Sequence, residues 1–148
     1  MRNHSTRPNT ALHQILEPDT GAACLPGGTP ELADHGDPEA TLIREAREEA
    51  AAELAGARYI GYLSDPHGPC SRIRYAAALA SLGPATADPS TGRTYVRILA
   101  TPEQALGLFD WGPPAVEQLL AVHEARVLLG IPEAAHQPVT ELSAPITW

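Results

Sequence analysis

The stretch LPGGTPELADHGDPEATLIREAREEAAAEL, residues 25–54, decides how the rest of this chain is interpreted. It joins a loop with two adjacent glycines to a segment rich in arginine and glutamate, in a chain otherwise dominated by alanine, leucine and proline. Asp37 is a favourable helix N-cap and Pro38 suits the first helical position. We therefore predict a helix from Asp37 to about Ala55, with Gly56 as its stop.

The apolar residues of this helix indicate which side faces the core. They recur at helical spacing and predict a buried stripe made of Leu42, Ile43, Ala46, Ala50 and Leu54.

Three glutamates give the same helix a second, charged side. Glu45, Glu48 and Glu49 stand at positions i, i+3 and i+4, so their side chains project from one face. Carboxylates this close repel one another unless a cation compensates, and Arg44, one turn before Glu48, relieves part of that repulsion. Clustered oxygen ligands suit Mg²⁺ or Mn²⁺. A solvated helix face rich in Glu and Arg has the same sequence, and these residues alone do not separate the two interpretations.

The preceding loop favours the first interpretation, because a Gly-Gly turn lets the backbone come close to a ligand. The whole stretch resembles the Nudix box, whose pattern is G-x5-E-x7-R-E-U-x-E-E-x-G-U, with U an apolar residue. The match spans residues 27–52. PGG corresponds to the loop that opens the pattern, and the R-E-U-x-E-E core and final apolar place are matched by Arg44, Glu45, Ala46, Glu48, Glu49 and Ala52.

The sequence departs from this pattern at several points. Fifteen residues separate Gly28 from Arg44, where the pattern has 13. The box glycine is Ala51, which costs little if the helix simply continues there. Gly36 occupies the place of the first glutamate, and the nearby residues that could replace it are Glu31, Asp34, His35 and Asp37. Few residues precede Gly27, so the strand that the family has before the box is expected to be short or missing.

The resemblance implies the fold. Strands and helices mix without a regular βα alternation, which favours the α+β class. The family adds an α/β/α sandwich with a mixed central sheet, here with its first strand short or missing. Beyond the box, we expect strands at 57–63, 72–82 and 93–100, and helices at 102–109 and 115–130. The 148 residues fit one domain, with residues 1–10 and 132–148 expected to be loose.

The resemblance also implies an activity: cleavage of the diphosphate bond of a nucleoside diphosphate linked to another moiety, with Mg²⁺ or Mn²⁺. The metal would be held by the carbonyl of Gly27 and by Glu45, Glu48 and Glu49. Glu45 is alternatively the general base, and Arg44 would orient the carboxylates by salt bridging. In the family the base can also come from a downstream loop, where Asp88 and Glu103 are candidates.

Substrate contacts are expected downstream of the box. Four arginines, Arg72, Arg74, Arg93 and Arg97, stand against the single carboxylate of Asp88, and Arg72 and Arg74 are our candidates for phosphate binding. Ordinary strand-face charge is the alternative. Base stacking or core packing is open to the aromatic residues Tyr59, Tyr62, Tyr75, Tyr95 and Trp111.

Composition limits the partners. The net charge of −8 argues against broad nucleic-acid binding. The apolar runs are far shorter than the roughly 20 residues of a membrane span, and the N-terminus lacks the apolar core of a signal peptide, so we expect a cytoplasmic protein with free Cys24 and Cys70. An exposed sheet edge left by a missing strand would favour a homodimer.

Two other functions remain open. A Nudix-fold protein that has lost turnover would bind a nucleotide or a partner without releasing product, and Gly36 and the short segment before the box are the reasons to consider it. A protein outside this family could instead use the acidic helix as an interaction module, and its stability would not respond to metal.

Overall fold

A computed structural model describes residues 12–16, 20–64, 68–109, 112–133, 138–143 and 145–147. Residues 1–10, expected to be loose, and Trp111, a candidate for base stacking, lie outside the described residues. The described chain is mixed α and β, as expected. Three helices accompany two antiparallel sheets, one with strand order β2-β1-β5-β6 and one with order β3-β4-β7.

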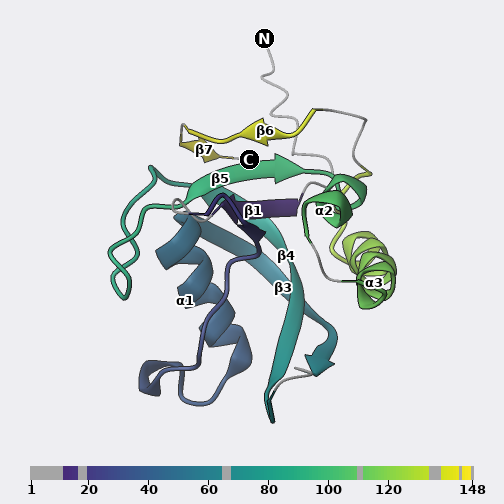
Figure 1. Ribbon diagram of the computed structural model, residues 1–148, viewed down its shortest axis with the longest axis horizontal. Coiled ribbons are helices and arrows are strands. Elements are labelled where there is room, and N and C mark those ends of the chain that lie inside the picture. Colours follow the sequence, from purple (N-terminus) through teal and green to yellow (C-terminus); the bar gives the residue numbers. More distant parts are fainter. Residues whose placement is uncertain are drawn as a thin grey trace.

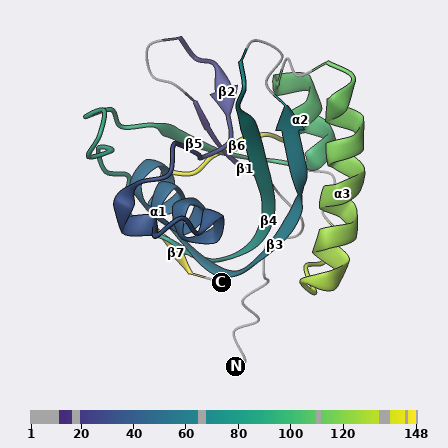
Figure 2. The ribbon, with the colours of Figure 1, turned by 90° about the horizontal axis from the view of Figure 1, so that it is seen from below.

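The three-stranded sheet, called the larger sheet because its strands are longer, is built on one long hairpin. β3 (Ala52–Ser64) pairs antiparallel with β4 (Ser71–Leu82), with register shifts that include one between Tyr59 and Gly61. At the far end of the hairpin, β7 (Ile146–Thr147) pairs with the last two residues of β4. α1 lies on one side of this hairpin, and α2 and α3 lie on the other (Figures 1 and 2).

The smaller sheet is centred on two adjacent strands, β1 (Leu12–Leu16) and β5 (Val96–Ala100). β2 (Ala23–Cys24) and β6 (Thr140–Glu141) extend it at either side. All pairings described are antiparallel and fall in two sheets, which differs from the single mixed sheet that we expected. Part of the tail expected to be loose, residues 132–148, contributes β6 and β7.

α1 (Pro38–Ala50) begins as predicted and ends earlier than predicted. The Asp37 carboxylate accepts a hydrogen bond from the Glu39 N–H, which caps the first turn. The helix stops at Ala50 because Ala51 adopts a left-handed conformation (φ 52°, ψ 36°) and Ala52 then pairs with Leu82. The expectation of a helix to Ala55 was therefore wrong: strand pairing overrides the helical propensity of the alanines.

α2 (Pro102–Leu108) and α3 (Pro114–Leu128) match the two downstream helices of the prediction. Thr101 and Gln104 form a reciprocal capping box at the start of α2. A short 3-10 turn, η1 (Leu32–Asp34), lies in the loop before α1. No described helix is long and apolar enough to cross a membrane.

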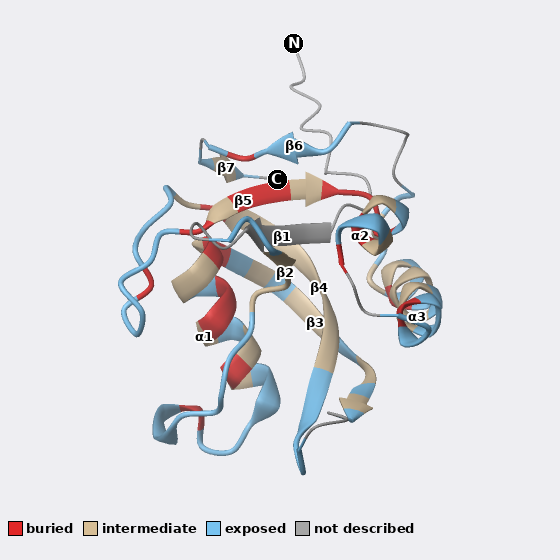
Figure 3. Cartoon of the chain, in the orientation of Figure 1, coloured by how far each residue is buried: buried red, intermediate tan, exposed pale blue. Residues whose placement is uncertain are grey.

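The core lies where α1, β5 and the open end of the hairpin, at Ala52 and Leu82, meet (Figure 3). Its buried residues are Ala46, Ala50, Ala52, Leu82, Tyr95 and Leu142. The predicted stripe on α1 is confirmed at Ala46 and Ala50, but Ile43 is exposed. Glu45 is buried instead, which brings a charged group to the inner side of the helix.

Candidate functional site

Arg44 is the centre of a hydrogen-bonded network between α1 and the loop before it. Its Nε and Nη2 donate to the two carboxylate oxygens of Asp34 at 3.1 and 3.0 Å. Its Nη1 donates to Glu45 Oε1 at 2.7 Å and to Glu48 Oε2 at 3.0 Å, and Nη2 also reaches the Thr29 carbonyl. The guanidinium thus links two of the three glutamates to the loop, through salt bridges of the kind that the resemblance implied.

Asp34 is the acidic residue that binds Arg44 from the loop. Its side chain is buried and accepts further hydrogen bonds from the Thr41 hydroxyl at 2.9 Å and the Glu31 N–H at 2.8 Å. The hydrogen bonds from Arg44 are the largest of the effects that hold the pKa of Asp34 well below its usual range. Gly36, by contrast, is exposed with φ 74° and would meet nothing if it carried a side chain.

The two glycines lie directly against the other face of the glutamate cluster. The Gly27 N–H donates to Glu49 Oε2 at 2.8 Å, across 22 positions of sequence. A Cβ on Gly28 would lie 2.5 Å from Glu45 Cδ and 2.8 Å from Glu45 Oε2, so only glycine fits there without displacing the carboxylate. At Gly27 a Cβ would meet no atom within 4 Å. The loop and the helix are therefore in close contact at the glutamates.

Burial and mutual repulsion disfavour ionisation of two glutamates of this cluster. Burial raises the pKa of Glu45, and Glu48 and Asp88 add to the rise although Arg44 opposes it. Burial also raises the pKa of Glu49 to about 7, with further contributions from Glu45, Asp88 and Glu48, while the hydrogen bond from Gly27 opposes the rise. One arginine thus compensates only part of the charge on these carboxylates.

The donor chemistry fits a hard divalent cation, since carboxylate and backbone carbonyl oxygens are the ligands that Mg²⁺ and Mn²⁺ prefer. The side chains as they stand are occupied, however: Glu45 and Glu48 with Arg44, and Glu49 with Gly27. Over the residues described, no group of three or more acidic, histidine or cysteine side chains is arranged to hold a metal ion. Binding would require the glutamates to exchange these partners for the ion.

The two downstream candidates for a general base are both engaged elsewhere. Asp88 is buried and accepts hydrogen bonds from Ser90 and Thr91 on both of its carboxylate oxygens. Burial alone would raise its pKa, but these hydrogen bonds outweigh burial and lower it. Glu103 lies on α2 and contacts His123 Nε2 at 2.9 Å, on the side of the hairpin away from α1 (Figure 2). Neither is arranged as a free proton acceptor beside the glutamates.

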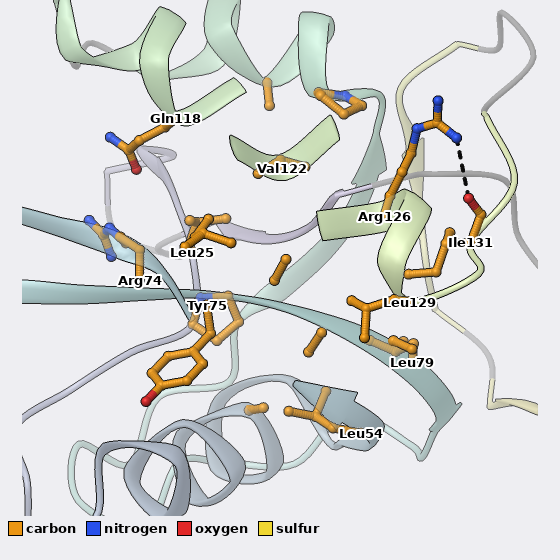
Figure 4. A pocket seen from close by; sticks show the side chains of 18 of the residues that line it. Leu25, Leu54, Arg74, Tyr75, Leu79, Gln118, Val122, Arg126, Leu129 and Ile131 are labelled. Atoms are coloured by element: carbon orange, nitrogen blue, oxygen red, sulfur yellow. Dashed lines mark hydrogen bonds between the residues drawn. The ribbon is translucent and has the colours of Figure 1, made fainter. Parts of the chain in front are cut away.

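The four arginines predicted as a phosphate-steering surface do not share one environment. Arg97 is 2% exposed, so its assignment to that surface was wrong. Its Nη1 instead donates to the carbonyls of Ala50 and Gly83, at 3.1 and 2.6 Å. Arg72 is exposed, and Arg74 lines a cavity beside α3 (Figure 4).

The tyrosines divide in a similar way. Tyr95 is buried in the core, whereas Tyr59 and Tyr62 are 55% and 62% exposed on the hairpin. Tyr59 packs edge-to-face against Tyr75, with ring centroids 5.9 Å apart. Tyr59 and Tyr62 are therefore available at the surface, while the core-packing alternative holds for Tyr95.

Sequence reasoning missed two contacts that shape the site. Four residues were candidates to replace the first glutamate of the box, and Asp34 is the one that binds Arg44 on both carboxylate oxygens. Its position depends on the 3-10 turn and on His35, which adopts a left-handed φ of 52°. The link from Arg97 to the end of α1 has no local sequence signal, because its partners are backbone carbonyls 47 and 14 positions away. Comparisons of the chain with protein-family models, with curated proteins and with solved structures found no match.

Proposed function

We propose that this protein is a divalent-metal-dependent hydrolase that cleaves the diphosphate bond of a nucleoside diphosphate linked to another moiety. The observation that carries the proposal is the contact between the Gly-Gly loop and α1. Gly27 binds Glu49 and Gly28 lies against Glu45, so the residues that resemble the Nudix box meet in space as well as in sequence.

Each residue of the cluster has a role in this proposal. The Gly27 carbonyl, Glu45, Glu48 and Glu49 would hold Mg²⁺ or Mn²⁺, which when bound neutralises phosphate charge and lowers the pKa of a bound water. Arg44 is a positioning residue, because it holds the carboxylates rather than the substrate. Glu45 is alternatively the general base: its raised pKa suits proton transfer, although it is engaged with Arg44 as the two downstream candidates are engaged with their own partners.

A nucleotide-binding protein without turnover is the second candidate. It is favoured by the absence of a free base among the described residues near the glutamates, and by the exposed Gly36 at the place of a glutamate. In this case the charge cluster would still bind a metal–nucleotide complex, but no product would be released.

The test is a screen of nucleoside diphosphate derivatives for hydrolysis in Mg²⁺ and in Mn²⁺. It compares the wild type with the double variant Glu48→Gln plus Glu49→Gln. The control is Glu117→Gln plus Glu124→Gln, which makes the same charge change at exposed positions of α3. We expect metal-dependent product in the wild type and the control, and none in the first variant.

Thermal unfolding with added metal separates the remaining outcomes. A metal that binds only the folded state stabilises it by RT ln(1 + [M]/Kd), about 2.7 kcal/mol at 100 times Kd. Stabilisation that Glu48→Gln plus Glu49→Gln abolishes, without hydrolysis of any compound, would favour the binding protein. A wild type whose unfolding does not respond to Mg²⁺ or Mn²⁺ would contradict both candidates and favour an acidic interaction helix.

A further inference from the structure

One edge of β4 has no strand beside it over most of its length. β3 pairs with β4 from Ser71 to Leu82 along the first edge. Along the second edge only Ser81 and Leu82 pair, with β7. Between residues 71 and 80, no other strand of the described chain joins this second edge. Because a strand directs its N–H and C=O groups to both sides, this edge presents main-chain donors and acceptors in a row.

A cavity of about 370 Å³ runs along this stretch, and its lining shows that it reaches the strand edge. It touches every residue from Ile73 to Ala80. Its lining also includes Ala46 of α1 and Val122 of α3, two helices that lie on opposite sides of the hairpin (Figure 2). The cavity therefore passes around one edge of β4, because β3 already occupies the other edge. Figure 2 shows the second edge turned toward the smaller sheet.

The far walls of the cavity are apolar and come from several elements. Leu25 follows β2, Leu99 lies on β5, and Phe109 follows α2. In Figure 4, Leu25 lies between Tyr75 of β4 and Gln118 of α3. Gln118 adds a polar group, since its Nε2 is buried with no hydrogen-bond partner among the described residues.

The sequence of β4 explains why this space is open and unprotected. Residues 75–80 read YAAALA, and short alanine side chains leave unfilled volume that larger residues would occupy. Exposed strand edges are usually guarded by charged residues or proline. Residues 75–80 contain neither, and all six are half-buried. Arg74 supplies a charge at one end of this edge and also lines the cavity, so the apolar template for another strand is the stretch 75–80.

We propose that this slot binds a short, extended, apolar segment of another polypeptide, which adds as a strand beside β4. A polypeptide matches both features of the slot, because its main chain pairs with the edge and its side chains contact the apolar walls. A compact apolar ligand would contact the apolar walls of the slot but would leave the main-chain groups of the edge unpaired. A second copy offering its own β4 edge would bring its walls and helices against those of the first. This inference does not rest on the proposed hydrolase activity.

The test uses the full chain, labelled with ¹⁵N, and an acetylated, amidated hexapeptide of alternating valine and threonine. A second peptide of the same sequence is N-methylated at alternate positions, which removes ladder donors but keeps the apolar side chains. The variant Ala78→Arg blocks the slot. Ala57→Arg is its control, because Ala57 lies on the neighbouring strand and does not line the cavity. The readout is amide hydrogen exchange and chemical shift for each residue.

We expect the first peptide, at about millimolar concentration, to slow amide exchange between residues 73 and 80 about tenfold. The N-methylated peptide and Ala78→Arg should abolish the effect, and Ala57→Arg should retain it. Equal binding of both peptides would overturn the proposal in favour of a pocket for small apolar ligands. Protection along the outer edge of β3, or no effect of either peptide, would overturn it as well.

Discussion

Replacing Ala51 by glycine should stabilise the protein, although most substitutions destabilise. Ala51 follows the last residue of α1 at φ 52°, a conformation that costs an L-residue roughly 1–2 kcal/mol and glycine almost nothing. Glycine adds freedom to the unfolded chain, which costs about 0.4–1 kcal/mol. Because Ala51 is half-buried, its methyl group adds little packing energy. The expected net gain is about 0.5–1 kcal/mol in the free energy of unfolding.

The control is the same substitution one residue earlier. Ala50 is 1% exposed and helical, so Ala50→Gly loses helix propensity and a buried methyl group, together about 1–2 kcal/mol. Urea unfolding of the three proteins measures both changes. For a chain of this size each kcal/mol corresponds to about 2–4 °C in Tm. If Ala51→Gly lowers the urea midpoint as Ala50→Gly does, then α1 continues past Ala50 in solution and Ala51 does not adopt the left-handed conformation.

Three more predictions test the environment of the glutamates. Asp34→Asn should make the free energy of unfolding depend less on pH in acid. The folded-state pKa of Asp34 is lowered, so its carboxylate stabilises the protein above the unfolded pKa of about 3.9 and loses this contribution as pH falls further. The urea midpoints of wild type and variant should therefore converge from about pH 5 to about pH 2. Arg97→Met should cost about 2 kcal/mol in urea unfolding, because two backbone carbonyls lose their buried donor, whereas exposed Arg58→Met should stay within about 0.5 kcal/mol; equal midpoints would contradict the burial. Gly28→Ala should lower the free energy of unfolding by about 1–3 kcal/mol through the carboxylate it displaces, and Gly27→Ala should not; similar thermal melts of the two variants would mean that the loop does not contact the helix.

Local signals predicted the start of α1 and the pairing of Arg44 with Glu48. Asp37 and Pro38 cap and begin the helix through contacts within one turn, and Glu48 is one turn from Arg44, so neither prediction needed tertiary information. The end of the helix did need it. Ala51 belongs to a run of three alanines that favours helix, and only pairing of the next residue with Leu82 turns the chain away.

The less predictable parts of the site depend on long-range contacts. Nothing in the sequence distinguishes Asp34 from its acidic neighbours until the loop folds back to place it beside Arg44 and Thr41. Arg97 and Arg93 share one side of an extended strand by spacing, yet one is buried and the other exposed. The strand begins only at Val96 and not at residue 93 as expected, so the alternation that would place both arginines on one face does not extend back to Arg93.

The buried guanidinium of Arg97 joins three parts of the chain at one point. It extends from β5 of the smaller sheet and holds the last carbonyl of α1 and the carbonyl of Gly83, just beyond β4 of the larger sheet. Because Arg97 belongs to β5 and binds the other two parts, β5 cannot separate without breaking the hydrogen bonds to Ala50 and Gly83. We expect α1 and the two strands to unfold as one cooperative unit, and the glutamates to lose their arrangement only when that unit unfolds.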